Sequence, residues 1–397
     1  MSDSIGVAVI GAGMAGRAHA AAYRAASTLY DPVLPEIRLV SIGDVNPVFG
    51  EAAARRFGFE RTDQNWQAIA EADDIDVVSV VIANHLHREV VEGLLAAGKH
   101  VLCEKPLSDT IADAEAMADA ARTASSVARV GFTFRRAPGI AFVRDLVQSG
   151  ELGEILHFRG RYWADYSCDP MAPITWRYKG PMGSGALADV GSHLSYIAEF
   201  IAGEVIEVSG GRFSTVINER PVPLEATVGH GHVAVSDTFE PVENDDYAAF
   251  TAGFANGASG SIEVSRVAAG HPNGLAFEVF GTKGTASWNQ ERPSEISLFK
   301  TEGEPSQRGE RQVILGPNHP YVAGGFPMDA PGIGFGQNDG FVFQARSFLE
   351  EVAGMPEGDS LPRCATFDEG IHSMRMLEAV AESARNAGAA VRVEKEN

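Results

Sequence analysis

A glycine-rich turn near the start of the chain restricts its fold more than any other feature. A short apolar run, Gly6–Ile10, leads into the turn, and an alanine-rich stretch typical of a helix, Arg17–Ser27, follows it. This strand–turn–helix context allows a tight turn, close approach of the backbone to a pyrophosphate, and N–H groups at the helix start. It predicts a dinucleotide site, the alternative being a glycine-rich turn without a ligand. The residues expected to hold the ligand are Gly11, Gly13, Met14, Ala15 and Gly16.

The first third of the chain alternates strand patterns with helix patterns. Further strand-like runs are Ile37–Ile42, Val77–Ile82, His100–Cys103 and Val127–Phe132, and the helix-like runs between them are Glu51–Phe57, Glu89–Ala97 and Ala112–Thr123. Such alternation predicts a mostly parallel, doubly wound α/β sheet with helices on both faces. We expect this nucleotide-binding domain to span residues 1–134.

The pattern changes after residue 134. Long strand patterns cover Glu154–Trp163 and Val205–Ile217, and the turns Asn256-Gly257 and Gly281–Gly284 each predict a hairpin. Helices are expected near Gly340–Val352 and Phe367–Asn386, and the Gly- and Pro-rich residues 303–338 are expected to form ordered loops. The strand and hairpin patterns of residues 135–397 therefore predict an α+β domain with a large, mostly antiparallel sheet.

Composition limits the partners and the compartment. The formal net charge of −21 disfavours nucleic acid and anionic membranes, both of which favour basic surfaces. No apolar run reaches the roughly 18 residues that a membrane span needs. The start has no basic segment of the kind that opens a signal peptide, and three cysteines without a CxxC pair argue against a disulfide framework. We expect a cytoplasmic protein.

Asp44 ends the second strand and favours NAD over NADP. A carboxylate there can accept hydrogen bonds from ribose hydroxyls and repels a 2′-phosphate, and the neighbouring Val45 and Asn46 bring no positive charge. The spacing from the glycines is longer than usual because Ser27–Glu36 has the character of an insertion. The alternative is that Asp44 only caps the next helix, which has Pro47 near its first turn.

Polar residues follow two further strands at the edge where ligands of doubly wound sheets bind. Asn84 and His87 follow Val77–Ile82, and we expect them to position the cofactor. No metal is expected, because His85 and His87 at this spacing have no cysteine or carboxylate partner nearby.

Glu104-Lys105-Pro106 follows the strand His100–Cys103 at the same edge. A lysine there can hydrogen-bond a reacting hydroxyl, and its pKa falls if it is desolvated. The alternative is an ordinary solvated lysine at the end of a strand.

Asp189 and His193 lie four residues apart in a helix-like segment that begins at Gly185, so one helix face presents both side chains. A carboxylate beside an imidazole can orient the ring and set its proton affinity. Spacing alone leaves two structural alternatives open. Asp189 near a helix start is favoured by the helix dipole, and His193 could be a buried core histidine.

Taken together, these motifs resemble the glucose–fructose oxidoreductase / inositol dehydrogenase family over nearly the whole chain. The segments that carry the resemblance are Gly11–Gly16 with His19, Glu104–Pro106, Gly150–Ile155 and Gly183–His193. Within the family the chain is similar to the sugar 3-dehydrogenases, in the segments Asn84–His87, Phe134–Pro138, Trp176-Arg177, His319–Tyr321 and Gly332–Gly336.

The resemblance implies a Rossmann domain, an α/β domain whose open sheet mediates homodimers or homotetramers, and hydride transfer from a ring hydroxyl of a sugar, anhydrosugar or glycoside to NAD, at C3. It implies that Lys105, Asp189 and His193 are catalytic and also bind the substrate. Further cofactor contacts are expected from Glu104, Lys105, Trp176 and Arg177, and further substrate contacts from Arg135, Tyr162 and Asp165. Two alternatives remain open, an inositol 2-dehydrogenase and a non-catalytic NAD(P)-sensing regulator.

Overall fold

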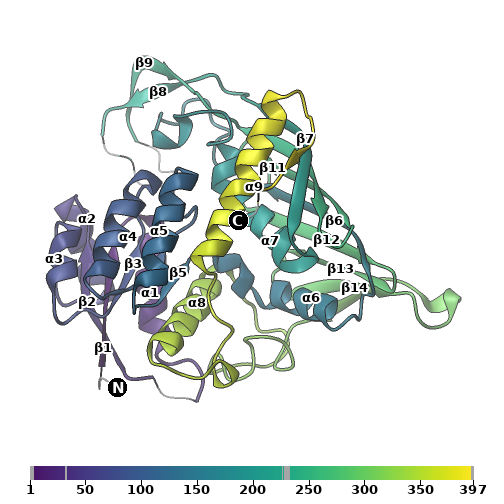
Figure 1. Cartoon of the computed structure of the whole chain (residues 1–397), viewed down its shortest axis with the longest axis horizontal. Coiled ribbons are helices and arrows are strands. Elements are labelled where there is room, and N and C mark those ends of the chain that lie inside the picture. The colour runs from purple at the N-terminus through teal and green to yellow at the C-terminus, as the bar shows by residue number, and fades with distance from the viewer. Residues whose placement is uncertain (1–3, 32–33, 226, 228–232, 395–397) are drawn as a thin grey trace. The chain divides into compact units, whose positions relative to one another are not determined.

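The computed structural model describes residues 4–31, 34–225, 227 and 233–394 of the chain (Figure 1). Residues 32 and 33 of the expected insertion lie outside that range. Two compact units can be distinguished: Met1–Ala137 with Tyr321–Ala330 and Phe335–Ile371, and Pro138–Pro320 with Pro331–Gly334 and His372–Asn397. The domain boundary expected after residue 134 stays a prediction, because compactness does not establish which segments fold independently.

The first unit is built on a parallel sheet, as the β/α alternation predicts. In the described residues its strand order is β2-β1-β3-β4-β5, with every neighbouring pair parallel. Side chains on both faces of the central strands, such as Val7, Val77 and Val101, are fully buried, which is why these strands read as continuous apolar runs. The strands are β1 (Ser4–Ile10), β2 (Glu36–Gly43), β3 (Val77–Val80), β4 (His100–Cys103) and β5 (Ala128–Val130).

The helices of this unit begin and end where local chemistry favours it. Asn46 accepts a hydrogen bond from the Val48 N–H at the start of α2, and Thr110 accepts one from Asp113 at the start of α5. Residues Ala345, Phe348 and Leu349 of a helix late in the chain join the same apolar core as α1. The helices are α1 (Met14–Ala26), α2 (Pro47–Phe57), α3 (Trp66–Glu71), α4 (His87–Ala96), α5 (Ile111–Thr123) and α8 (Gln337–Val352).

The second unit contains a large sheet whose order, in the described residues, is β15-β14-β13-β12-β6-β11-β10-β7-β16. Its pairs are antiparallel except β6 with β11, and both expected hairpins are confirmed, β10–β11 around Gly257 and β12–β13 after Gly281. A separate pair is formed by β8 (Glu219–Pro223) and β9 (Val235–Pro241). The strands of the large sheet are β6 (Ile155–Trp163), β7 (Val205–Ser214), β10 (Tyr247–Phe254), β11 (Ser259–Ser265), β12 (Gly274–Gly281), β13 (Gly284–Asn289), β14 (Glu295–Lys300), β15 (Arg311–Ile314) and β16 (Val391–Arg392).

Helices cover one face of this sheet (Figure 1). On α6 (Pro138–Gln148), Gly139 lies against Trp288, and on α7 (Ser192–Ala202), Leu194 lies against Gly160, where a Cβ would approach Leu194 to 2.8 Å. The second part of α9 (Phe367–Arg385) lies along β7, where Ser383 Oγ accepts a hydrogen bond from Gly211. The covered face therefore holds the core of this unit.

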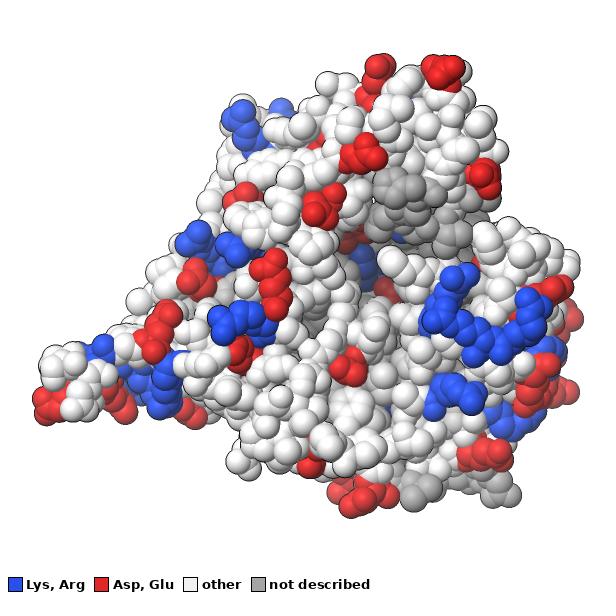
Figure 2. Space-filling view, turned by 180° about the vertical axis from the view of Figure 1, so that it is seen from behind, with Lys and Arg blue, Asp and Glu red and all other residues white. Residues whose placement is uncertain are grey.

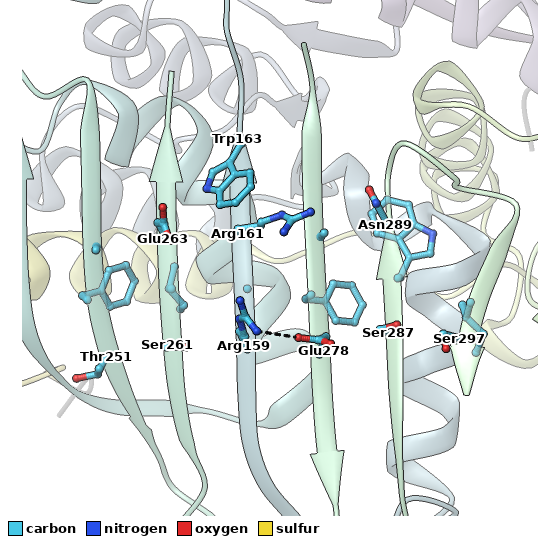
Figure 3. A pocket seen from close by; sticks show the side chains of 18 of the residues that line it. Arg159, Arg161, Trp163, Thr251, Ser261, Glu263, Glu278, Ser287, Asn289 and Ser297 are labelled. Carbon is cyan, nitrogen blue, oxygen red and sulfur yellow. Dashed lines mark ion pairs between the residues drawn. The ribbon is translucent and has the colours of Figure 1, made fainter. Parts of the chain in front are cut away.

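The opposite face carries mainly polar side chains (Figure 3). Arg159, Arg161 and Trp163 alternate along β6 with buried residues, and Arg159 pairs with Glu278 of β12 at 3.6 Å. A broad groove crosses this face of the strands. Alternation of this kind is typical of an antiparallel sheet with one face in the core.

Two expectations about this half were wrong. Residues 303–338 are not all loop, because Arg311–Ile314 forms β15 at the sheet edge against β14. The strand expected to reach Ile217 ends at Ser214, because Val216 and Ile217 turn to donate their N–H groups to Asp246 at 2.7 and 3.0 Å. Both differences arise from contacts with residues distant in the sequence, which a local strand pattern cannot reveal.

Acidic and basic side chains are interspersed on the face shown in Figure 2. Ion pairs such as Arg38–Glu60 at 2.9 Å and Arg61–Asp74 at 2.7 Å join many of the arginines to carboxylates. Across the described ranges, no helix combines the length and the apolar character needed to cross a bilayer.

Candidate active site

The glycine-rich turn has the shape that a dinucleotide site requires. Gly11 has φ +106°, and a Cβ on it would lie 2.0 Å from the Val81 carbonyl oxygen. A Cβ on Gly16 would lie 1.8 Å from the Gly11 carbonyl oxygen. Gly13 differs, because a Cβ there would meet nothing within 4 Å among the described atoms. The backbone is therefore tightly packed at Gly11 and Gly16, whereas the space beside Gly13 is open and a phosphate group can approach there.

The first turn of α1 faces the same open space. Gly13 is the N-cap of α1 and has no side chain with which to cap it, so N–H groups at the helix start are available to an anion. Met14 is 60% exposed, and Arg17 Nε donates to the Ala12 carbonyl oxygen at 3.0 Å. These observations fit a bound pyrophosphate.

Asp44 stabilises the glycine-rich turn through hydrogen bonds to the backbone. Its Oδ2 accepts the Ala12 N–H at 2.8 Å, and its Oδ1 accepts the Asn46 N–H at 2.8 Å. Asn46, not Asp44, caps α2, so the simple capping alternative is wrong. The carboxylate stays at the end of β2, and the next residue, Val45, is 93% exposed.

Glu104 lies in a buried polar network behind the ligand edge. Its Oε1 lies 2.8 Å from His19 Nε2, its Oε2 accepts the Lys105 N–H at 3.1 Å, and Ser79 Oγ lies within hydrogen-bond distance of both His19 and Tyr23. Burial opposes ionisation of Glu104, but the contact with His19 and the nearby Lys105 charge outweigh it, so the pKa of Glu104 lies below its ordinary value. His19 therefore anchors the residue that precedes Lys105.

His87 connects the two loops that carry the other expected residues. Its side chain is fully buried, and its ring nitrogens lie 3.0 Å from the Leu107 carbonyl oxygen and 3.1 Å from that of Ile82. Burial lowers its pKa. In this conformation His87 offers no ring nitrogen to a cofactor, and we expect it to hold the loops rather than to touch the ligand.

Asn84 opens the short 3₁₀ helix Asn84–Leu86 and is half-buried. Lys105 is also half-buried, and the Lys105–Pro106 peptide bond is cis. Both residues thus lie at the carboxyl ends of neighbouring parallel strands, β3 and β4, as the sequence predicts.

The segment with Asp189 and His193 differs from the α-helix that we expected. Leu187–Gly191 forms a π-helical turn, and the α-helix α7 begins only at Ser192. Short π turns recur at functional sites, and over so few residues the sequence pattern does not distinguish a π turn from an α-helix. Both side chains are half-buried, so both can reach a ligand.

Two tyrosines complete this part of the site. Tyr166 donates its hydroxyl to Asp189 Oδ2 at 2.6 Å, and Tyr162, whose ring centroid is 6.1 Å from that of His193, donates to Asn273 Oδ1 at 2.7 Å. Burial and the Asp189 charge raise the pKa of both tyrosines, so both remain protonated donors. Tyr162 was expected here, whereas Tyr166 and Asn273 were missed, and nothing in their spacing connects them to the pair.

The remaining expected residues have varied surroundings. Trp176 is 59% exposed at the start of the 3₁₀ helix Trp176–Tyr178, and the Arg177 guanidinium stacks 4.5 Å from its ring centroid. Asp165 is half-buried in the turn after β6. Arg135 donates to Glu369 Oε1 at 3.1 Å, so part of its charge is already balanced.

The structure brings the expected residues together in three groups. The first is the Gly11–Gly16 turn with Asp44, the second is Glu104 and Lys105 beside the loop of Asn84, and the third is Tyr162 with Asp189 and His193. The first two groups belong to the first unit and the third to the second. Among the residues with described positions, no three His, Cys, Asp or Glu side chains gather as a metal site.

Comparison with known proteins matches both units. Residues 5–132 match an oxidoreductase family with an NAD-binding Rossmann fold, and residues 140–287 match the GFO/IDH/MocA C-terminal domain. A levoglucosan dehydrogenase from Pseudarthrobacter phenanthrenivorans is 38% identical over 386 residues, 96% of each chain. The scyllo-inositol 2-dehydrogenase (NAD⁺) of Bacillus subtilis is 26% identical over 305 residues, 76% of this chain and 79% of that one.

A solved structure of levoglucosan dehydrogenase in complex with NADH and levoglucosan superposes with a TM-score of 0.89 at 35% identity. The match covers 99% of this chain and all of the other. The likeness therefore extends over both units, each with the fold expected from the sequence.

Proposed function

The chain belongs to the Gfo/Idh/MocA family of NAD-binding oxidoreductases, and from this membership we propose that it oxidises a ring hydroxyl of a sugar or anhydrosugar of the levoglucosan type, at C3. The observation that carries the proposal is the likeness to levoglucosan dehydrogenase along 96% of the chain. The polar group of the buried Tyr162 and the half-buried Asp189 and His193 supports it, because hydroxyl-rich substrates need several hydrogen-bonding partners.

The first unit would hold the cofactor. The Gly11–Gly16 turn and the start of α1 offer N–H groups to the pyrophosphate, and Asp44 stands where a ribose binds. When bound, NAD⁺ supplies the acceptor for the hydride that leaves the substrate carbon. The absence of a positive charge at Val45 and Asn46 supports NAD over NADP.

The chain itself must take the hydroxyl proton as the alcohol becomes a ketone. We assign this step to His193, whose imidazole is a suitable base near neutral pH. Asp189, fixed by Tyr166, orients and stabilises the imidazolium that results. Lys105 hydrogen-bonds the same substrate oxygen and stabilises the negative charge that develops on it. We propose that Trp176 and Arg177 contact the cofactor. Arg135 and Asp165 are proposed to contact the substrate.

The test is NADH formation with purified protein and a panel of levoglucosan, glucose, methyl glucosides, and myo- and scyllo-inositol. We expect turnover with a pyranoside, and NMR of the product should give a ketone at C3. Turnover with a cyclitol alone would make the protein an inositol dehydrogenase. Binding of NADH without oxidation of any polyol would favour a sensing regulator, and NAD(H) that stays bound through purification would identify an enzyme that retains its cofactor.

Substitutions at Lys105 and His193 test the catalytic role proposed for each residue. Lys105→Met and His193→Asn should each reduce turnover by at least about a thousandfold while leaving NADH affinity within a few fold, because general base catalysis and charge stabilisation each contribute factors of this order. Lys283→Met, at an exposed lysine of the hairpin between β12 and β13, is the matched control. Retained turnover in either site variant would remove that residue from the mechanism.

We also propose that copies of the chain associate through the polar face of the large sheet, as the family resemblance implies. On this face Trp163, Arg161 and Arg159 lie in a row along β6 and line the broad groove (Figure 3). Light scattering after size exclusion should give a dimer or tetramer, and Arg161→Glu should reduce its size. A cytoplasmic location is proposed because Cys103, Cys168 and Cys364 are not bridged.

A further inference from the structure

Three consecutive polar residues immediately before β10, Asn244-Asp245-Asp246, are fully buried. Neither the sequence patterns nor the proposed chemistry uses them. Burying two carboxylates is costly unless each is hydrogen-bonded or paired. Asp246 is paired, because its Oδ1 accepts Arg266 Nε at 2.8 Å. The partners of Asp245 are different.

Asp245 accepts four backbone N–H groups from one short segment. Its Oδ1 accepts from Gly183 at 2.7 Å and Gly185 at 3.0 Å, and its Oδ2 accepts from Leu187 at 2.8 Å. Its backbone oxygen accepts from Ala186 at 2.8 Å. These donors immediately precede or open the π turn that carries Asp189, where a helix otherwise leaves its first N–H groups without partners.

Gly185 and the backbone of Asp245 also approach each other closely. A Cβ on Gly185 would lie 2.1 Å from the Asp245 backbone oxygen, so only glycine permits this approach. A carboxylate has two acceptor oxygens, whereas an asparagine amide has one oxygen and an NH₂ group that would face the N–H of Leu187. The segment is therefore fitted to an aspartate at position 245.

The neighbouring Asn244 fixes a second segment. Its Nδ2 donates to the carbonyl oxygens of Arg177 at 3.0 Å and Lys179 at 3.1 Å. Arg266 donates to the Arg177 carbonyl oxygen at 3.0 Å and to Asn244 Oδ1 at 2.8 Å. Hydrogen bonds from Asn244 and Asp245 thus hold two segments beside the start of β10. These segments are the Trp176–Tyr178 turn and the residues that lead into the Asp189–His193 segment.

We propose that Asp245 is a positioning residue, which sets the angle at which Asp189 and His193 meet the substrate. The proposal rests on the proposed function of that pair. A misplacement of about 1 Å can cost about a hundredfold in rate, so the loss of the three bonds that the Asp245 carboxylate accepts at the start of the turn should appear in kcat. The carboxylate of Asp245 binds the backbone N–H groups of Gly183, Gly185 and Leu187, and it takes no part in the proposed chemistry.

The first measurement is hydrogen exchange, followed by mass spectrometry, of peptides that cover residues 183–193. Asp245→Ala should strongly reduce the protection of the Gly183, Gly185 and Leu187 amides, and Asp245→Asn should reduce it less. Asp246→Asn is the matched control, since it removes an equally buried carboxylate whose N–H donors are Val216 and Ile217. Unchanged exchange in both Asp245 variants would overturn the proposal.

The second measurement is kinetic, on variants that retain a folded-state melting transition. We expect kcat to fall about a hundredfold in Asp245→Ala and about tenfold in Asp245→Asn, with NADH affinity within about twofold of wild type. The pH at which kcat reaches half its maximum should also shift, which a merely structural role would not cause. The exposed Asp237→Asn should behave as wild type.

Gly185→Ala provides a second approach if Asp245→Ala does not fold, because its Cβ pushes the same segment from the other side. Faster exchange with unchanged kcat and pH profile would show that the contact only stabilises the fold, and would overturn the proposal. If the wild-type protein turns over no polyol at all, the proposed function fails, and the positioning role of Asp245 fails with it, even if exchange shows that the contact exists.

Discussion

The hydroxyl of Tyr166 donates a 2.6 Å hydrogen bond to Oδ2 of Asp189. Burial, reinforced by the Asp189 charge, raises the pKa of Tyr166 well above its usual value, so the proton stays on the phenol and the bond keeps its direction. One oxygen of Asp189 is therefore fixed by the loop after β6. In the proposed mechanism, the orientation of His193 therefore depends on a tyrosine 23 positions before Asp189 in the chain.

Replacing Tyr166 by Phe should lower kcat while leaving the fold intact. A hydrogen bond to a charged group contributes about 1.5–3 kcal/mol, so we expect a loss of about ten- to a hundredfold. Steady-state kinetics with the preferred sugar measures it, and Tyr247→Phe, on the partly exposed start of β10, is the control. Full activity in Tyr166→Phe would mean that Asp189 needs no such support.

Gly13→Ala and Gly16→Ala should separate cofactor binding from folding. The Cβ at position 13 enters open space, so the melting temperature should stay near wild type while NADH affinity falls at least about tenfold, because the methyl group occupies the path of the pyrophosphate. The Cβ at position 16 meets the Gly11 carbonyl oxygen, so stability and affinity should both fall. Titration of NADH fluorescence and calorimetry would measure the two effects. Unimpaired NADH binding in Gly13→Ala would place the cofactor elsewhere.

Asp44→Ala should weaken NADH binding about tenfold and reduce the preference for NAD over NADP. The substitution removes both the acceptor for the Ala12 and Asn46 N–H groups and the negative charge that repels a 2′-phosphate. Kinetics with the two cofactors gives the ratio of kcat/KM values, and Asp73→Asn, at an exposed site of the same unit, is the control. An unchanged ratio would show that another residue selects the cofactor.

Stability should depend on pH through His372. His372 Nε2 donates a hydrogen bond to Glu199 Oε1 at 2.7 Å, and this bond raises the pKa of the histidine above 6.5 in the folded state. Its contribution is therefore fully present below pH 6.5 and is lost as the pH rises through the raised value. His372→Gln should be less stable than wild type by about 1–2 kcal/mol at pH 5.5, and the difference should shrink at pH 9.

Urea unfolding at the two pH values measures this difference, and His85→Gln, at an exposed histidine, is the control. A gap between wild type and His372→Gln that grows towards pH 9 would contradict the assignment.

The nucleotide-binding half could be predicted well from the sequence because its signals are local. Gly11 and Gly16 are required by the close packing of the turn, and the parallel strands are buried on both faces, so their apolar runs stand out. Positions at the ends of β3 and β4 then followed from the topology. The cofactor contact expected of His87 stays a prediction, whereas its contact with the Leu107 carbonyl oxygen, twenty residues away, could not be read from the sequence.

The second half was less predictable for the same reason. Its hairpins were found from their turns, but the π turn before α7 arises where Asp245 accepts N–H groups from residues about sixty positions earlier. Tyr166 and Asn273 likewise bond to partners that lie 23 and 111 positions away in the sequence. A single sequence shows which residues can do chemistry, whereas the residues that hold them in place are defined by contacts that form only in the folded protein.

The central strand β6 pairs on one side with β11 and on the other with β12, both about a hundred residues later in the chain. Leu194, which follows His193 in α7, packs over Gly160 of that strand. During synthesis, the chain therefore emerges with its proposed catalytic helix long before the surface that supports it exists. A nascent chain stalled before Gly274 should expose α7 to chaperones and proteases, and it should become resistant only when β12 has left the ribosome.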